Sequence, residues 1–291
     1  MNNIRGILLI VLSMAAFAVE DMMIKYLSAT VALGQILIFL GVLSTLVFWR
    51  ISSRQGHSVF MRHAWRGVPL ARMLTEIVSP MAFLTALSLI DLSTVAAVFQ
   101  ATPLVATMGA ALFLKEQVGW RRWSAVCIGF LGVLCIIRPG QVGFEPATLL
   151  VLVAVFGIAA RDLLTRVSDT SIPSTVLSFQ GYLALSVAGL LLMFVQGTAF
   201  DAMTGTEWSL MLIATLIGMV AYLAIVVGLR LGDASVVTPF RYTRLVFSLI
   251  LGMTVFGERP DAMTFLGAAV IIASGLYAFL RERSLMRAHP G

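Results

Sequence analysis

The stretch Ala18-Val19-Glu20-Asp21-Met22-Met23-Ile24-Lys25 recurs in altered form as Ala159-Ala160-Arg161-Asp162-Leu163-Leu164-Thr165-Arg166, 141 positions later. Both versions keep the aspartate, the apolar pairs and a basic residue at the end. A shift of 142 positions aligns four further residues with residues of the same type, namely Asp91, Ser93, Val95 and Glu116 with Asp233, Ser235, Val237 and Glu258. Because the matches lie near both ends of each half of the chain, the sequence predicts that one half is a duplicate of the other.

The composition excludes a soluble enzyme. Of the 291 residues, 59% are hydrophobic and only 12% are charged, whereas soluble domains carry about 25% charged residues. The net charge of +6 would suggest a nucleic-acid partner in a soluble chain. Here the basic residues flank long apolar segments, so we expect a lipid bilayer around the chain and no nucleic acid.

Ten apolar segments are each long enough to cross a membrane as a helix. Helices are expected because the segments exceed the length of a barrel strand and lack its alternation. The predicted fold class is therefore an all-α polytopic membrane protein with ten transmembrane helices. The segments are 4–26, 33–50, 68–90, 93–114, 122–138, 147–165, 174–196, 208–230, 234–256 and 262–281.

The basic residues predict the orientation. Of the 20 Lys and Arg, three lie inside predicted spans and three flank them on one side, which leaves fourteen on the other side. Basic residues concentrate on the cytoplasmic side, so both termini are expected there. The residues inside spans are Arg72, Arg241 and Arg244, and the three on the sparse side are Lys25, Arg138 and Arg259.

Each half of the duplication holds five predicted spans, with the first repeat at 1–138, the second at 147–281 and a cytoplasmic tail at 282–291. An odd number of spans returns the chain on the opposite side, so the second copy must enter the membrane inverted. Inverted repeats recur in secondary transporters, in which two similar packings expose one central site alternately to each side.

At this level the chain resembles the drug/metabolite transporter superfamily, specifically its ten-span members with two EamA domains, over residues 6–138 and 147–281. The resemblance rests on Ala18 to Lys25, on Leu104 to Glu116 leading to Gly129 and Gly132, on Gly232 to Pro239, and on Phe256-Gly-Glu-Arg-Pro260. It implies secondary active transport in a bacterial inner membrane. It also implies a cavity between the first, third and fourth spans and the sixth, eighth and ninth, and it leaves a homodimer open.

Charges inside the predicted spans mark the candidate substrate site. A charge at mid-membrane costs roughly 2.5–3.5 kcal/mol, so it needs a partner, a water-filled cavity or a function. Counted from the centre of its span, Arg244 lies about 2 Å from the midplane, with Arg241 about 6 Å and Glu76 about 5 Å toward the cytoplasm. We expect Glu76 to be the counter-ion of the arginines, which then either lock two helices together or bind a polar group of the substrate.

Two adjacent carboxylates, Glu20 and Asp21, lie in the outer half of the first span. Neighbouring helical residues point about 100° apart, so we expect one of them to face the cavity. A buried carboxyl there could bind and release a proton and couple transport to the proton gradient. The alternative is that Glu20 pairs with Lys25 at the end of the helix.

Several neutral polar and aromatic residues complete the predicted site. Aromatic faces with a few hydrogen-bonding groups suit a flat heteroaromatic solute, although each residue singly could be a packing residue. Prolines inside spans are predicted to interrupt the helices, with Pro103 and Pro239 as candidate hinges beside Pro80. The predicted lining residues are Tyr242, Tyr222, Gln100 and Thr102, with Gln180 and Tyr182 beside them.

The predicted function is secondary active transport of a small polar or aromatic metabolite by alternating access. Arg241 to Arg244, followed by Gly257-Glu-Arg-Pro260, is similar to the riboflavin-transporter branch of the family, so riboflavin uptake is the first choice. The alternatives are S-adenosylmethionine, a nucleoside-like solute or amino-acid export. A channel would need a ring of like charge. An intramembrane enzyme would need catalytic groups that the spans lack, and no cofactor or metal is expected.

Overall fold

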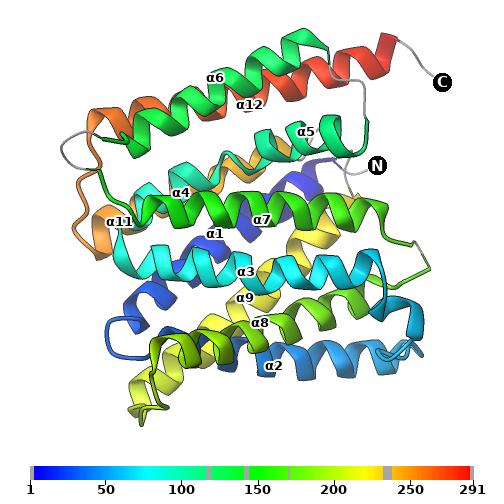
Figure 1. Ribbon diagram of the computed structural model, residues 1–291, viewed down its shortest axis with the longest axis vertical. Helices are drawn as coiled ribbons and strands as arrows, with labels where there is room; N and C mark the ends of the chain where they lie inside the picture. Colours follow the sequence, from blue (N-terminus) through cyan, green and yellow to red (C-terminus); the bar gives the residue numbers. More distant parts are fainter. Residues whose placement is uncertain (1–2, 116–118, 141–143, 170, 232–237, 289–291) are drawn as a thin grey trace. The chain divides into compact units, whose positions relative to one another are not determined.

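The computed structural model describes residues 3–115, 119–140, 144–169, 171–231 and 238–288 (Figure 1). Within these ranges all regular secondary structure is helical. The elements are α1 (Asn3–Leu27), α2 (Leu33–Arg54), η1 (Arg62–Trp65), α3 (Val68–Leu89), α4 (Leu92–Phe99), α5 (Thr102–Phe113), α6 (Trp120–Ile137), α7 (Thr148–Val167), α8 (Ser174–Gln196), α9 (Gly205–Leu231), η2 (Thr238–Tyr242), α11 (Thr243–Val255) and α12 (Ala262–Ala288).

The helices follow the predicted spans closely, and the ten-helix fold is confirmed. Within the described ranges, seven segments, one of them formed by α4 and α5 together, are long and apolar enough to cross a membrane. α6 and α12 contain shorter apolar stretches at Trp123–Ile137 and Ala262–Ala278. Backbone groups in lipid must bond within their own segment, and continuous apolar runs satisfy this as helices.

Two predicted spans are not continuous helices. Between α4 and α5, the amides of Gln100 and Ala101 donate to carbonyls three residues back, which tightens the chain into a turn. Pro103 lies in the first turn of α5, where its missing donor is not needed, and Pro239 lies in η2. The predicted interruption at Pro80 is wrong because α3 runs through it as a single helix.

The chain forms two compact units that do not follow the boundary between the repeats. The first comprises Met1–Met22, Leu89–Leu149 and Leu216–Gly291, and the second comprises Met23–Ser88 and Leu150–Thr215. Each unit therefore combines segments from both halves of the duplication. A unit of this kind cannot form from one repeat alone.

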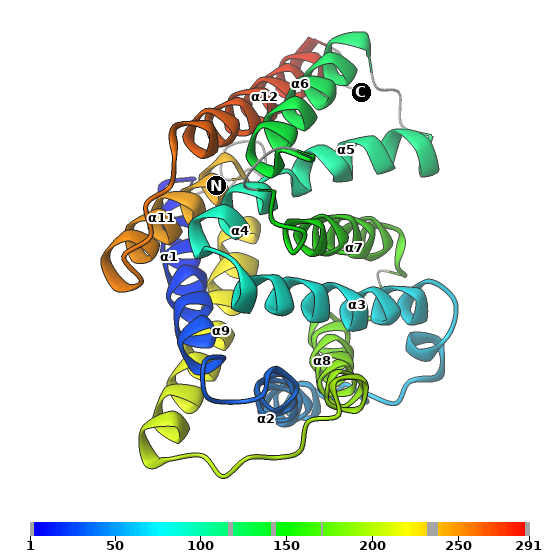
Figure 2. The same ribbon diagram turned by 60° about the vertical axis from the view of Figure 1, so that its left-hand side comes forward.

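Each unit contains a pair of long helices in which a segment of the first repeat packs against its counterpart in the second repeat. α6 lies along α12 in the first unit, and α2 lies along α8 in the second (Figure 2). Glycines bring the backbones together: a Cβ on Gly132 would come 2.8 Å from the Gly267 carbonyl oxygen, and one on Gly189 would come 2.5 Å from that of Gly34. Small residues are the usual means of close packing between membrane helices.

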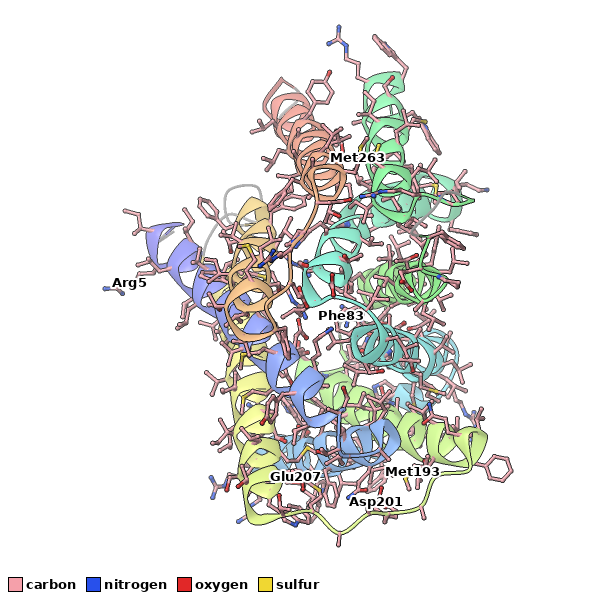
Figure 3. The ribbon with its side chains drawn as sticks, turned by 90° about the vertical axis from the view of Figure 1, so that its left-hand side faces the viewer. Arg5, Phe83, Met193, Asp201, Glu207 and Met263 are labelled. Atoms are coloured by element: carbon pink, nitrogen blue, oxygen red, sulfur yellow. The ribbon has the colours of Figure 1, made fainter. Side chains whose placement is uncertain are left out.

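The connection between α8 and α9 is held on α2 within the second unit. The Gln35 side chain donates to the Asp201 carbonyl at 2.9 Å and accepts from the Asp201 amide at 3.0 Å. Glu207, at the start of α9, accepts a 2.6 Å hydrogen bond from Thr30. Figure 3 labels Asp201 and Glu207 along this connection. Hydrogen bonds from a side chain thus pair backbone groups in a segment that forms no helix.

The ends of α6 and α12 are joined by a charged contact. Arg138, the residue after α6, forms an ion pair with Asp261, which directly precedes α12. Asp261 also accepts from the Thr264 amide at 2.9 Å, as an N-cap residue does. The hydrogen bond from Arg138, with that from the Thr264 backbone, lowers the pKa of the Asp261 carboxyl to about 2.

Replacing Gly132 by alanine should loosen the α6–α12 pair. The new methyl group meets backbone, which cannot rotate away, so the free energy of unfolding should fall by about 1–3 kcal/mol. Thermal unfolding of the purified protein in detergent measures the effect. Gly119→Ala is the matched control because a Cβ there meets nothing within 4 Å. Equal melting temperatures for both variants would contradict the close packing.

The Asp261 contact should stabilise the protein in a pH-dependent manner. Its pKa is lowered on folding from an ordinary value of about 3.9, so the stabilisation is present above about pH 4 and is lost as the pH falls toward 2. Melting temperatures of wild type and Asp261→Asn should therefore differ at pH 5 and converge at low pH. Asp201→Asn is the control. Asp201 bonds to Gln35 through its backbone and its side chain is exposed, so the difference in melting temperature between this variant and wild type should not depend on pH in this way.

Candidate functional site

An ion pair in the first compact unit joins α1 to α11. Arg244 donates from Nη2 and Nε to the same oxygen of Asp21, Oδ2, at 2.6 and 3.2 Å. Both side chains are shielded from solvent, with exposed fractions of 17% for Arg244 and 7% for Asp21. A charge-assisted contact of this kind is strong because little water competes for it.

Two phenyl rings accompany the Arg244 guanidinium. Its central carbon lies 5.2 Å from the centroid of the Phe17 ring on α1 and 5.1 Å from that of the Phe99 ring at the end of α4. Cations are attracted to aromatic faces at such distances. Arg244 is thus held by three helices, α1, α4 and α11.

The expectation that Glu76 is the counter-ion of Arg244 is wrong. The carboxylate bound to Arg244 is that of Asp21, and Glu76 pairs with Arg72 on its own helix and with Arg161 on α7. That expectation rested on the depth of Glu76 along its span. Which carboxylate pairs with Arg244 depends instead on the direction in which each side chain leaves its helix. The i, i+4 spacing of Arg72 and Glu76 was the signal in the sequence that pointed to their contact.

Arg72 is buried in the second unit, with an exposed fraction of 6%. Its Nε donates to the Thr165 hydroxyl at 2.8 Å, its Nη1 to the Leu177 carbonyl at 3.1 Å and its Nη2 to Glu76 at 3.2 Å. Arg161 approaches the same Glu76 oxygen at 3.8 Å. This network ties α3 to α7 and α8.

Glu20 and Asp21 point to different neighbours, as adjacent helical residues must. Asp21 faces Arg244 of α11, while the Glu20 carboxylate lies against Gly218 of α9, where a Cβ would collide with it. Under the shifts of 141 and 142, Glu20 corresponds to Arg161 and Gly218 to Glu76. One copy therefore has an arginine–glutamate pair where the other has a glutamate facing a glycine.

The other predicted substrate contacts in the first unit differ in burial and in the groups they contact. Gln100 and Thr102 are buried at the turn between α4 and α5, where the Thr102 hydroxyl donates to the Phe99 carbonyl at 2.6 Å. Tyr242, which corresponds to Gln100 under the shift of 142, places its hydroxyl against Gly275 of α12. Tyr222 on α9 and Arg241 in η2 are half-buried.

Gln180 and Tyr182, the two predicted residues on α8, make packing contacts within the second unit. The Gln180 amide donates to the Ala64 carbonyl at 2.6 Å. The Tyr182 ring stacks on Phe48 of α2 with a centroid distance of 5.3 Å. Both contacts hold α8 to its neighbours.

Sequence reasoning missed Phe17, Phe99 and Gly218. Phe17 lies one turn before Asp21, so both residues share a face of α1 and reach the same neighbour. That spacing was a usable signal. Gly218 carried none, because its role depends on which residue of α1 approaches it.

Comparison with known proteins gives consistent matches. A Vibrio cholerae riboflavin transporter is 34% identical over 179 residues, which cover 61% of this chain and 59% of that protein. A Rhizobium johnstonii riboflavin transporter is 27% identical over 95% of this chain and 91% of its own length. A Rickettsia felis S-adenosylmethionine uptake transporter is 25% identical over 97% and 94%, respectively.

A solved crystal structure shares the fold. It has a TM-score of 0.59 and 18% sequence identity, and the match covers 97% of this chain and 96% of that one. The model of the EamA-like transporter family matches residues 4–138 and 146–280, which confirms the two EamA repeats expected from the motifs. The chain therefore belongs to the EamA-like transporter family and is a multi-pass membrane transporter, not an enzyme.

Proposed function

We propose that the protein takes up a flat, polar aromatic metabolite across a bacterial inner membrane by alternating access, with riboflavin as the first candidate. The observation that carries the proposal is the shielded Arg244, bound by Asp21 and flanked by Phe17 and Phe99. A guanidinium presents paired donors that fit the adjacent acceptors of a ring imide or a carboxylate. The Vibrio and Rhizobium relatives named riboflavin transporters support this substrate.

The surroundings of Arg244 suit a planar solute. Phe17 and Phe99 supply aromatic surface, and the buried Gln100 supplies an amide that can both donate and accept. Few polar groups among apolar walls are the usual composition of a small-molecule site. In this proposal Arg241, Tyr222, Tyr242 and Thr102 remain predicted substrate contacts, and Pro103 and Pro239 remain predicted hinges.

S-adenosylmethionine is the second candidate. The relative from Rickettsia felis, which matches nearly the whole chain, is named for its uptake. The sulfonium and ammonium groups of that solute are cationic, and the Glu20 carboxylate next to Asp21 would attract them. In either case we propose that both termini lie in the cytoplasm, as the distribution of basic residues predicts, and that the carrier can form a homodimer.

Uptake of labelled riboflavin and labelled S-adenosylmethionine into proteoliposomes tests the substrate. Wild type should saturate with one of them and should exchange external label for internal substrate. Arg244→Ala and Arg244→Lys should lower kcat/KM by about 10- to 100-fold. Alanine removes the charged hydrogen-bond donor, and lysine keeps the charge but lacks the paired donors of the guanidinium.

Arg259→Ala is the control for that experiment, since it removes an exposed arginine outside the helices. Normal riboflavin uptake by Arg244→Ala would show that Arg244 does not bind the substrate. Transport of S-adenosylmethionine alone would select the second candidate. A flux that rises linearly with concentration and shows no exchange would indicate a channel.

Glu76 remains a predicted substrate residue, and Glu76→Gln separates its two possible roles. If Glu76 mainly holds α3 to α7 through Arg72 and Arg161, the variant should unfold at a lower temperature and keep the KM of wild type. A raised KM with unchanged melting temperature would instead indicate contact with the substrate. Thermal unfolding and uptake on the same preparation give both readings.

A further inference from the structure

We infer that transport is coupled to protons by an exchange of partners on Arg244. An acceptor group of the substrate replaces Asp21 on the guanidinium, and the released Asp21 carboxylate then takes up one proton. The inference rests on the proposed function, in which Arg244 binds the substrate.

The geometry makes the substrate and Asp21 competitors. Arg244 directs both Nε and Nη2 at the single Oδ2 atom of Asp21. A guanidinium donates in the plane of its nitrogens, while the Phe17 and Phe99 rings approach its central carbon. A carbonyl, imide or carboxylate that takes paired donors from the Nε–Nη2 edge must displace Asp21, and we place the substrate at this edge.

The released carboxylate cannot remain charged at low cost. The Asp21 side chain is only 7% exposed, and an unpaired ion away from water is strongly disfavoured. Glu20, the next residue on α1, is a second acidic group and cannot compensate the charge of Asp21. Protonation of Asp21 removes the penalty.

The charged and titratable groups near Asp21 come from several elements of the first unit and from its own helix. α1 supplies Glu20, whose carboxylate lies against α9, and Lys25, one turn beyond Asp21, whose ammonium group donates to the Leu87 carbonyl at 3.2 Å. α11 supplies Arg244, and α4 contributes the uncharged Phe99 to this cluster. Among the side chains of η2 and α9 that the structure describes in this unit, the further titratable or charged ones are Arg241, Tyr242 and Tyr222.

The proton balance is simple. On the side from which the substrate enters, the carboxylate of Asp21 gains one proton from water. On the other side, the substrate leaves, Asp21 loses that proton and its carboxylate binds Arg244 again. One proton therefore moves with each substrate molecule, so a neutral substrate carries one net positive charge across the membrane.

The first test uses proteoliposomes, riboflavin and an imposed pH gradient, acidic on the side of entry. Wild type should accumulate riboflavin above the external concentration. Asp21→Asn should lose accumulation but keep exchange of external for internal riboflavin, because Arg244 can still bind it. Asp21→Glu, which restores the carboxylate, should recover accumulation.

Asp162→Asn is the matched control. Asp162 is the counterpart of Asp21 in the second repeat and is likewise paired with an arginine, Arg161, at 2.7 Å. It should retain accumulation. The inference is overturned if Asp21→Asn accumulates riboflavin as wild type does, if it loses exchange as well while remaining folded, or if Glu20→Gln alone abolishes the dependence on the gradient.

A second measurement needs no variant of Asp21. Riboflavin added to wild type in weakly buffered detergent solution should withdraw one proton from solution per molecule bound, which a pH indicator reports. Riboflavin binding without a pH change overturns the exchange and leaves the proposed function intact. Absence of riboflavin binding and transport in wild type overturns the choice of riboflavin instead, and the same titration with S-adenosylmethionine then decides between the two substrates.

Discussion

The structure of the first compact unit depends on keeping a charged arginine among apolar helices. A single charge at this depth is costly, and a pair is tolerated only when each member is well bonded. Arg244 meets that condition through Asp21 and through the Phe17 and Phe99 rings, which come from α1 and α4. The three helices are therefore held together by the requirement to compensate one guanidinium.

The same requirement explains the second unit, with a different outcome. Arg72 is bonded to a hydroxyl, a carbonyl and a carboxylate from three helices, and Glu76 receives a second arginine, Arg161. This network involves many fixed partners, so displacing one of them leaves others unsatisfied. In the Asp21–Arg244 pair, by contrast, two bonds from the guanidinium end on one carboxylate oxygen.

The sequence was sufficient for the helices because hydrophobic length is a local property. The span predicted at 174–196 coincides with α8, and the one at 68–90 ends one residue beyond α3. The turn at Gln100 and Ala101 was not predicted, although Pro103 pointed to its neighbourhood. The partner of Arg244 was predicted wrongly, because depth follows from counting residues while the direction of a side chain depends on how helices rotate when they pack. The role of Gly218 lay beyond sequence reasoning for the same reason.

The duplication adds a constraint that packing alone does not. An inverted duplication predicts that positions 20 and 161 lie toward opposite faces of the membrane, as do positions 76 and 218. The backbone follows this symmetry, since α6 pairs with α12 and α2 with α8. The side chains do not: Arg161 meets Glu76, whereas Glu20 meets a glycine. Alternating access needs two equivalent packings of the helices, but it does not need the same chemistry on both sides. The backbone keeps the symmetry of the copies and the charges do not. The Asp21–Arg244 pair takes one residue from each copy, and the symmetry-related positions hold Asp162 and Thr102, which cannot form an equivalent ion pair.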